Sequence, residues 1–82
     1  MFYPIFYSFP LLLAALFGYN DVIRLLLTSP DLDINKADRE GNTALMIAVE
    51  TDFIDTIKLL LSHPNIDIKH QNEEGVFNFL LI

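Results

Sequence analysis

The sequence lacks cysteine altogether, which excludes disulfide bonds, zinc sites built on cysteine and thiol nucleophiles. Glycine is scarce, with 3 residues and no glycine-rich loop that could cradle a phosphate group. Basic side chains are also few: 5 Lys and Arg against 11 Asp and Glu give a net charge of -6, which opposes binding to nucleic-acid phosphates. The length of 82 residues excludes a two-domain enzyme. The missing cysteine fits an intracellular location, and the cytoplasm is the expected compartment.

Apolar residues make up 52% of the chain, enough to form a packed interior rather than a disordered segment. The first charged side chain is Asp21, so residues 1–20 could also be read as a signal peptide or a membrane anchor. A secretory signal needs a basic start and a small-residue cleavage site, whereas residues 1–8 contain no Lys or Arg. Pro4 and Pro10 should also interrupt a spanning helix. A buried or capping segment is therefore expected, and a membrane-tethered peptide is the alternative.

An internal repeat organises the chain. Residues Leu25–Ile34 (LLLTSPDLDI) align with Leu59–Ile68 (LLLSHPNIDI) at an offset of 34 residues. Further identical pairs in this register are Leu11 and Leu45, Ala14 and Ala48, Asp21 and Asp55, Ile23 and Ile57, Glu40 and Glu74, and Gly41 and Gly75. So many matches in one register indicate repeated structural units.

We expect a single domain, residues 1–82, containing one repeat at about 8–41, a second at about 42–75 and a partial third at 76–82. Phe77 and Asn78 stand where the third unit should repeat Thr43 and Ala44. Repeat units of this kind usually need about three copies to be stable, so apolar ends on a shorter array favour self-association, further repeats or a partner.

Each unit has the spacing of two helices. The apolar face expected for the second helix of the second unit contains Ile54, Ile57, Leu60 and Leu61. The polar face expected for the same helix contains Asp55, Thr56, Lys58 and Ser62. A shorter helix should precede it, from Ala44 to about Thr51, with Thr43 as the N-cap. Pro64 should end the second helix, and the polar segment that follows reads as a protruding loop.

These residues resemble the ankyrin repeat, whose pattern begins D-x-x-G-x-T-P-L-H-x-A. The second unit matches this pattern at Asp38, Gly41, Thr43, Leu45 and Ala48. In the first unit the same places are held by Pro10, Leu11 and Ala14. The resemblance covers about residues 9–75, and it implies an all-α fold: a stack of helix-turn-helix repeats forming a short α-solenoid with hairpin-like loops.

Two departures from the family pattern predict local differences. Leu12 and Met46 replace the family's His, so the hydrogen bonds that this His adds between neighbouring loops should be missing, with some loss of stability. Asp52 stands where the first unit has Gly18, so the turn between the helices of the second unit must differ or be strained.

The resemblance implies a non-catalytic module that recognises a protein through its loop tips and the exposed side of each first helix. The charges in this register favour a partner with a basic patch beside an apolar anchoring group, and no cofactor, small-molecule substrate or nucleic acid is expected. The predicted protein-binding residues are Leu16, Phe17, Arg39, Glu40, Asn42, Glu50, Thr51, Glu73 and Glu74. The alternative is a structural segment of a longer ankyrin array with no binding of its own.

Other chemistry is poorly supported. The D-x-D-x-N stretch at Asp31–Asn35 imitates the start of a calcium loop, but Lys36 occupies the place of the required Gly. A turn whose side chains bond their own backbone is expected there instead. His63 and His70 lack a third metal ligand, and a triad of Ser62, His63 and Asp67 would have no oxyanion hole.

Overall fold

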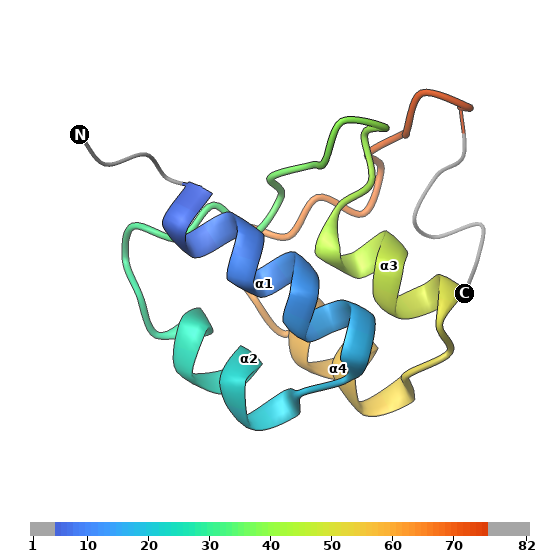
Figure 1. The fold of residues 1–82 in the computed structure, drawn as a ribbon. Helices are drawn as coiled ribbons and strands as arrows, with labels where there is room; N and C mark the ends of the chain where they lie inside the picture. Colours follow the sequence, from blue (N-terminus) through green and yellow to red (C-terminus); the bar gives the residue numbers. More distant parts are fainter. Residues whose placement is uncertain (1–4, 76–82) are drawn as a thin grey trace.

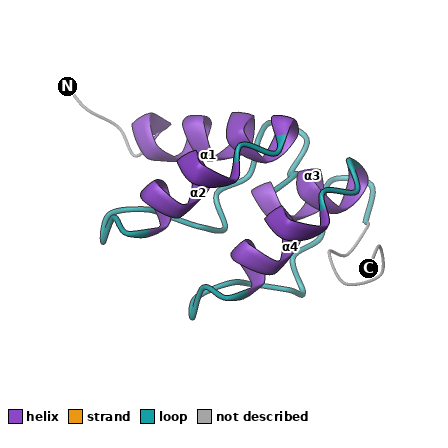
Figure 2. Cartoon of the chain, turned by 90° about the horizontal axis from the view of Figure 1, so that it is seen from below, coloured by secondary structure: helices purple, strands orange, loops and turns teal. Residues whose placement is uncertain are grey.

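The structure, a computed structural model, describes residues 5–75 as four helices in two antiparallel pairs (Figure 1). The first pair is α1 (Ile5–Phe17) and α2 (Asn20–Leu27), and the second is α3 (Ala44–Glu50) and α4 (Ile54–Leu61). Seen from below, the two pairs lie side by side in the same orientation, with α1 beside α3 and α2 beside α4 (Figure 2). The predicted all-α repeat stack is confirmed. The predicted third unit at 76–82 lies outside the described residues.

The core forms where the two pairs meet. It is built from small and branched side chains on one side of each helix, together with two from the loop after α2. Its buried members are Leu11, Ala14, Ala15, Ile23, Leu32, Ile34, Ala44, Leu45, Ala48, Ile57 and Leu60. Alanines at the α1 and α3 contact allow the helices to approach closely. Neither helix pair could shield these side chains from water by itself, as repeat architectures require.

The second pair matches the expected boundaries closely. Thr43 is the N-cap of α3, and its Oγ1 accepts a hydrogen bond from the amide of Met46 at 3.3 Å. The helix α4 ends at Leu61, ahead of Pro64, and the bend after it is closed by the amide of Ile66 donating to the carbonyl of His63 at 3.2 Å.

Two sequence-based expectations about the helices are wrong. Pro10 does not interrupt a helix, because α1 begins at Ile5 and runs through it; proline costs one backbone donor there, and the helix continues on both sides. Thr56, expected on the polar face of α4, is fully buried because α4 packs against α2, where its hydroxyl donates to Oδ1 of Asn20. A buried hydroxyl is tolerated when it has such a partner.

The Asp31–Asn35 segment forms the expected turn. Oδ1 of Asp33 accepts from the amide of Asn35 at 3.0 Å, which is an Asx turn. The side chain of Asn35 then reaches the second repeat, donating to the carbonyl of Asn65 at 2.8 Å and accepting from the amide of Asp67 at 2.8 Å. This segment therefore helps to hold the repeats together.

The turns between the helices of each pair have the same geometry, although one contains Gly18 and the other Asp52. The amide of Tyr19 donates to the carbonyl of Ala14 at 2.9 Å, and one repeat later the amide of Phe53 donates to that of Ala48 at 3.1 Å. Both turns need a left-handed residue, with φ of 69° at Gly18 and 62° at Asp52. The expected strain is therefore present at Asp52, where a side chain occupies a conformation that suits glycine.

Replacing Asp52 with Gly should raise the free energy of unfolding by about 0.5–1 kcal/mol, because the left-handed backbone would no longer carry a Cβ. Chemical denaturation measures the change. Gly18→Ala is the matched control and should destabilise, since a Cβ there would lie 3.1 Å from Cδ2 of Phe53. A D52G variant no more stable than the parent would show that the turn is unstrained.

Candidate protein-binding groove

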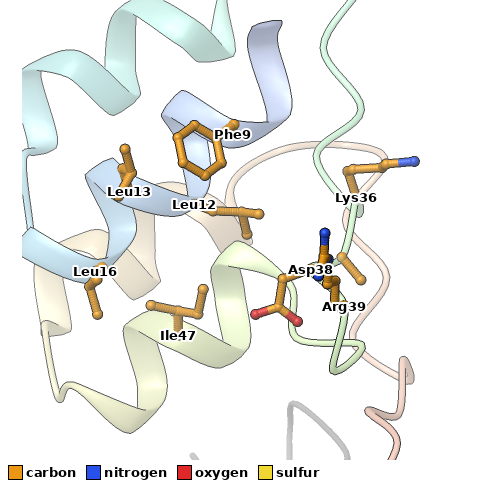
Figure 3. Close-up of a pocket in the computed structure, with 9 residues that line it drawn as sticks. Phe9, Leu12, Leu13, Leu16, Lys36, Asp38, Arg39 and Ile47 are labelled. Atoms are coloured by element: carbon orange, nitrogen blue, oxygen red, sulfur yellow. The ribbon is translucent and has the colours of Figure 1, made fainter. Parts of the chain in front are cut away.

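A groove of about 600 Å³ opens between α1, the start of α3 and the loop that joins the two repeats (Figure 3). Its floor and one wall are apolar and come mostly from successive turns of α1: Phe9, Leu12, Leu13 and Leu16, with Ile47 of α3 opposite. Phe9, Leu13 and Leu16 remain substantially exposed. An apolar hollow of this kind can accept apolar side chains of a ligand.

The other wall of the groove is the loop segment 36–39, whose exposed side chains are the basic residues Lys36 and Arg39. Asp38 also lines the groove, but Oδ1 of its carboxylate accepts from the amides of Glu40 at 3.0 Å and Asn42 at 2.8 Å. Asp38 thus fixes the shape of the loop, while Lys36 and Arg39 provide charge at the groove edge.

The tips of the two loops are tied together at the end of the groove. The amide of Glu73 donates to the carbonyl of Glu40 at 2.9 Å, and Nδ2 of Asn72 donates to Oδ1 of Asn42 at 3.0 Å. Nε2 of His70 lies 2.7 Å from the carbonyl oxygen of Gly41, so this nitrogen carries the proton and donates.

One of these contacts offsets the expected loss of the hydrogen bonds made by the family's His. Met46 and Leu12 do occupy the family's His positions, but His70, within the second loop, supplies an inter-loop hydrogen bond from a different place in the repeat. The loop tips are therefore held in a fixed relation despite the substitutions.

The predicted binding residues divide into three sets in the structure. Leu16 and Arg39 line the groove. Glu40, Glu50, Glu73 and Glu74 are exposed, three of them at the joined loop tips and Glu50 at the end of α3. The remaining three make contacts within the chain: Phe17 stacks on Tyr19, Asn42 bonds Asp38 and Asn72, and the Thr51 hydroxyl donates to the carbonyl of Ile47 at 2.8 Å.

Sequence reasoning missed part of the groove: Phe9, Leu12, Leu13, Lys36 and Ile47. A signal was available for the helical members, because Phe9, Leu13 and Leu16 recur at helical spacing. This spacing was not used, because the repeat pattern was followed only from about residue 9 and pointed to Leu16 and Phe17 as the exposed positions of the first helix. The contribution of Lys36 depends on the path of the loop, for which the sequence carries no such signal.

Within residues 5–75 the structure shows neither a cluster of three or more acidic or histidine side chains that could bind a metal ion nor a helix long and apolar enough to cross a membrane. The second observation bears on the apolar first helix, since α1 has 13 residues and a spanning helix needs about 20.

Comparison with known families agrees with this architecture. A family model described as ankyrin repeats (3 copies) matches residues 5–72, which is most of the chain. The protein therefore belongs to the ankyrin repeat family, whose members are generally protein-interaction modules and are typically not enzymes. No curated protein matches the sequence.

His70→Ala should loosen the joined loop tips, since it removes the hydrogen bond to Gly41. We expect a loss of about 1 kcal/mol in the free energy of unfolding and faster hydrogen exchange at the amide of Glu73. His63→Ala is the control: Nδ1 of His63 accepts only from Asn65 in its own loop, at 3.1 Å, so exchange at Glu73 should stay unchanged. Equal exchange at Glu73 in both variants would contradict the role of His70.

Proposed function

We propose that the protein binds a protein partner through the groove, which receives apolar side chains of the partner, while the acidic loop tips face basic residues of the partner. The observation that carries this proposal is the apolar hollow beside a charged, hydrogen-bonded loop pair. It is a binding function without a reaction, and it calls for no cofactor or small-molecule substrate. The intracellular location expected from the absence of cysteine remains part of the proposal.

The affinity would come mainly from the groove. Leu16 is 44% exposed and Phe9 is 55% exposed, so a bound apolar group would remove a substantial apolar area from water at the centre of the site. The shape is largely preformed, because Leu12 packs against the core and Asp38 holds the opposite loop. A preformed site loses less entropy when it binds.

The orientation and the specificity would come from the charges. Glu40 and Glu73 are brought together by the hydrogen bond between their backbones, and Glu74 follows directly, so the tips concentrate negative charge. Basic residues of a partner would be attracted there and would accelerate docking. Lys36 and Arg39, on the loop wall, repel a partner that is basic along its whole length, so the preferred ligand is one whose basic residues lie to one side of its apolar anchor.

Selection from a displayed random-peptide library tests this function with a defined probe. The selected peptides should combine apolar residues with Lys or Arg on one side. Leu16→Asp should weaken binding of a selected peptide by about tenfold or more, as expected for a central apolar anchor. Glu73→Lys with Glu74→Lys should mainly slow association and reduce its dependence on salt.

Leu25→Asp is the matched control, because Leu25 is an exposed leucine on α2 outside the groove. Its peptide affinity should equal that of the parent. The proposal fails if no peptide is selected, if the selected peptides lack basic residues, or if L16D and L25D weaken binding equally.

A further inference from the structure

Equivalent positions in the two repeats can be compared to show which side chains of the first helix pair are exposed while their counterparts in the second pair are covered. Val22 of α2 is 44% exposed, whereas its equivalent in α4, Thr56, is 0% exposed because the first pair covers it. Leu25 is 71% exposed, while its equivalent Leu59 is half-buried against the core. The first pair thus presents, uncovered, the same face that the second pair buries against its neighbour.

Described side chains on the outer face of the second helix pair are exposed in the corresponding way. Ile34 is 2% exposed at the contact between the repeats, but its equivalent Ile68 is 42% exposed. Ile54 is 53% exposed, and its equivalent Asn20 accepts the hydrogen bond of Thr56 across that contact. Among residues 5–75, two different faces are therefore exposed, and they correspond to the two sides of the internal interface between the repeats.

We propose that these two faces bind each other in different molecules, so that the chain associates head to tail with a second copy of itself: the outer face of α3 and α4 in one copy would pack on the outer face of α1 and α2 in the next. The contacts between copies can be derived from the internal interface. Each residue of an internal contact is replaced by its equivalent 34 residues away in the other repeat, and the two equivalents then lie in different copies. Three contacts show side chains of compatible chemistry at the displaced positions: one apolar, one ionic and one at the loop tips.

The first such contact is apolar. Within the chain, the buried polar pair at the helix contact is Asn20 and Thr56. Displaced by one repeat, this pair becomes Ile54 of one copy and Val22 of the second copy. A polar pair has been replaced on both sides by apolar residues, so that neither side chain would face an unmatched polar group. Both are exposed in the single chain and would be removed from water by association.

The second contact is ionic. Within the chain, the side chain of Asn35 bonds the backbone of Asn65 and Asp67. The displaced positions are Lys69 in one copy and Asp31 and Asp33 in the next. These three side chains are exposed. The ammonium group of Lys69 can donate to the carbonyl of Asp31, as Asn35 does to that of Asn65, and is attracted by the two carboxylates, although it cannot accept from the amide of Asp33.

The loop tips give a third contact, in which the side chains carry opposite charges. The backbone bond between Glu40 and Glu73 becomes a bond between Glu74 of one copy and Arg39 of the second, whose side chains are oppositely charged. The bond from His70 to the carbonyl of Gly41 becomes one from Lys36 to the carbonyl of Gly75, and Lys36 can also donate. The acidic end of one copy therefore meets the basic loop wall of the next.

The apolar contact of this association is separate from the proposed function, because Val22 and Ile54 do not line the groove, whereas the loop-tip contact shares Lys36, Arg39 and Glu74 with the proposed binding site. Since two different faces meet, each copy keeps one open face, and the stack can extend. The consequence is a concentration-dependent series of oligomers rather than a closed dimer.

Analytical ultracentrifugation of Val22→Glu, Ile54→Glu and their equimolar mixture tests the proposal. The parent should shift to larger sedimentation coefficients as its concentration rises, and each single variant should remain monomeric. The mixture should form a species of two chains and nothing larger, because the I54E chain keeps an intact α1 and α2 face and the V22E chain keeps an intact α3 and α4 face. Both substitutions are at exposed positions, and circular dichroism verifies that each variant stays folded.

A second pair of variants examines the ionic contact in the same way. The Lys69→Glu variant should associate more weakly than the parent. Mixing this variant with the Asp31→Lys, Asp33→Lys variant should restore pairing. A parent that stays monomeric at every concentration would overturn the proposal. So would a dimer that V22E abolishes but I54E does not, since that pattern indicates two like faces meeting, and so would a mixture of V22E and I54E that stays monomeric.

Discussion

The contact between the two helix pairs is the interaction on which the rest of the structure depends. Each pair is too thin to bury its own apolar residues, and the core consists of side chains contributed by both. The contact is mainly apolar, but the Thr56 hydroxyl at its centre is matched by Asn20, and Asn35 spans the loops. Apolar burial supplies the stabilising free energy, while these paired polar groups fix the register in which the two repeats meet.

The groove follows from this contact. Because α1 lies beside α3, Leu16 and Ile47 come from different repeats and face a common hollow. The same stacking brings the two loops close enough for the backbones of Glu40 and Glu73 to bond. A binding surface assembled from two repeats exists only when both are folded and stacked, so recognition and stability are coupled in this protein. Among the described residues, the same stacking leaves apolar side chains exposed on the outer face of each repeat, such as Val22 and Ile54.

Much of the fold could be predicted from the sequence, because a 34-residue register and helical spacing are local signals. These signals predicted the helices α3 and α4, the Thr43 N-cap and the strained backbone at Asp52. The burial of Thr56 could not be read this way, since it depends on a partner 36 residues away. The continuation of α1 through Pro10 was also not predicted, because proline is common at helix boundaries but does not always end a helix.

The site was harder to predict than the fold. Position in the repeat identified Leu16, Arg39 and the exposed glutamates as candidate contacts, but it did not distinguish them from Asn42 and Thr51, whose side chains bond within the chain. Whether a polar side chain is available to a partner depends on its hydrogen bonds in three dimensions. The groove likewise required the relative placement of a loop and two helices.

Native-state hydrogen exchange on an Ile57→Val variant tests the shared core most directly. Ile57 belongs to α4, and its truncation should cost about 1 kcal/mol. If the two pairs stabilise each other, the slowest amides of α1 and α2 should lose the same free energy of protection as those of α3 and α4. Protection lost only in α3 and α4 would contradict the account, because the first pair would then be stable without its neighbour.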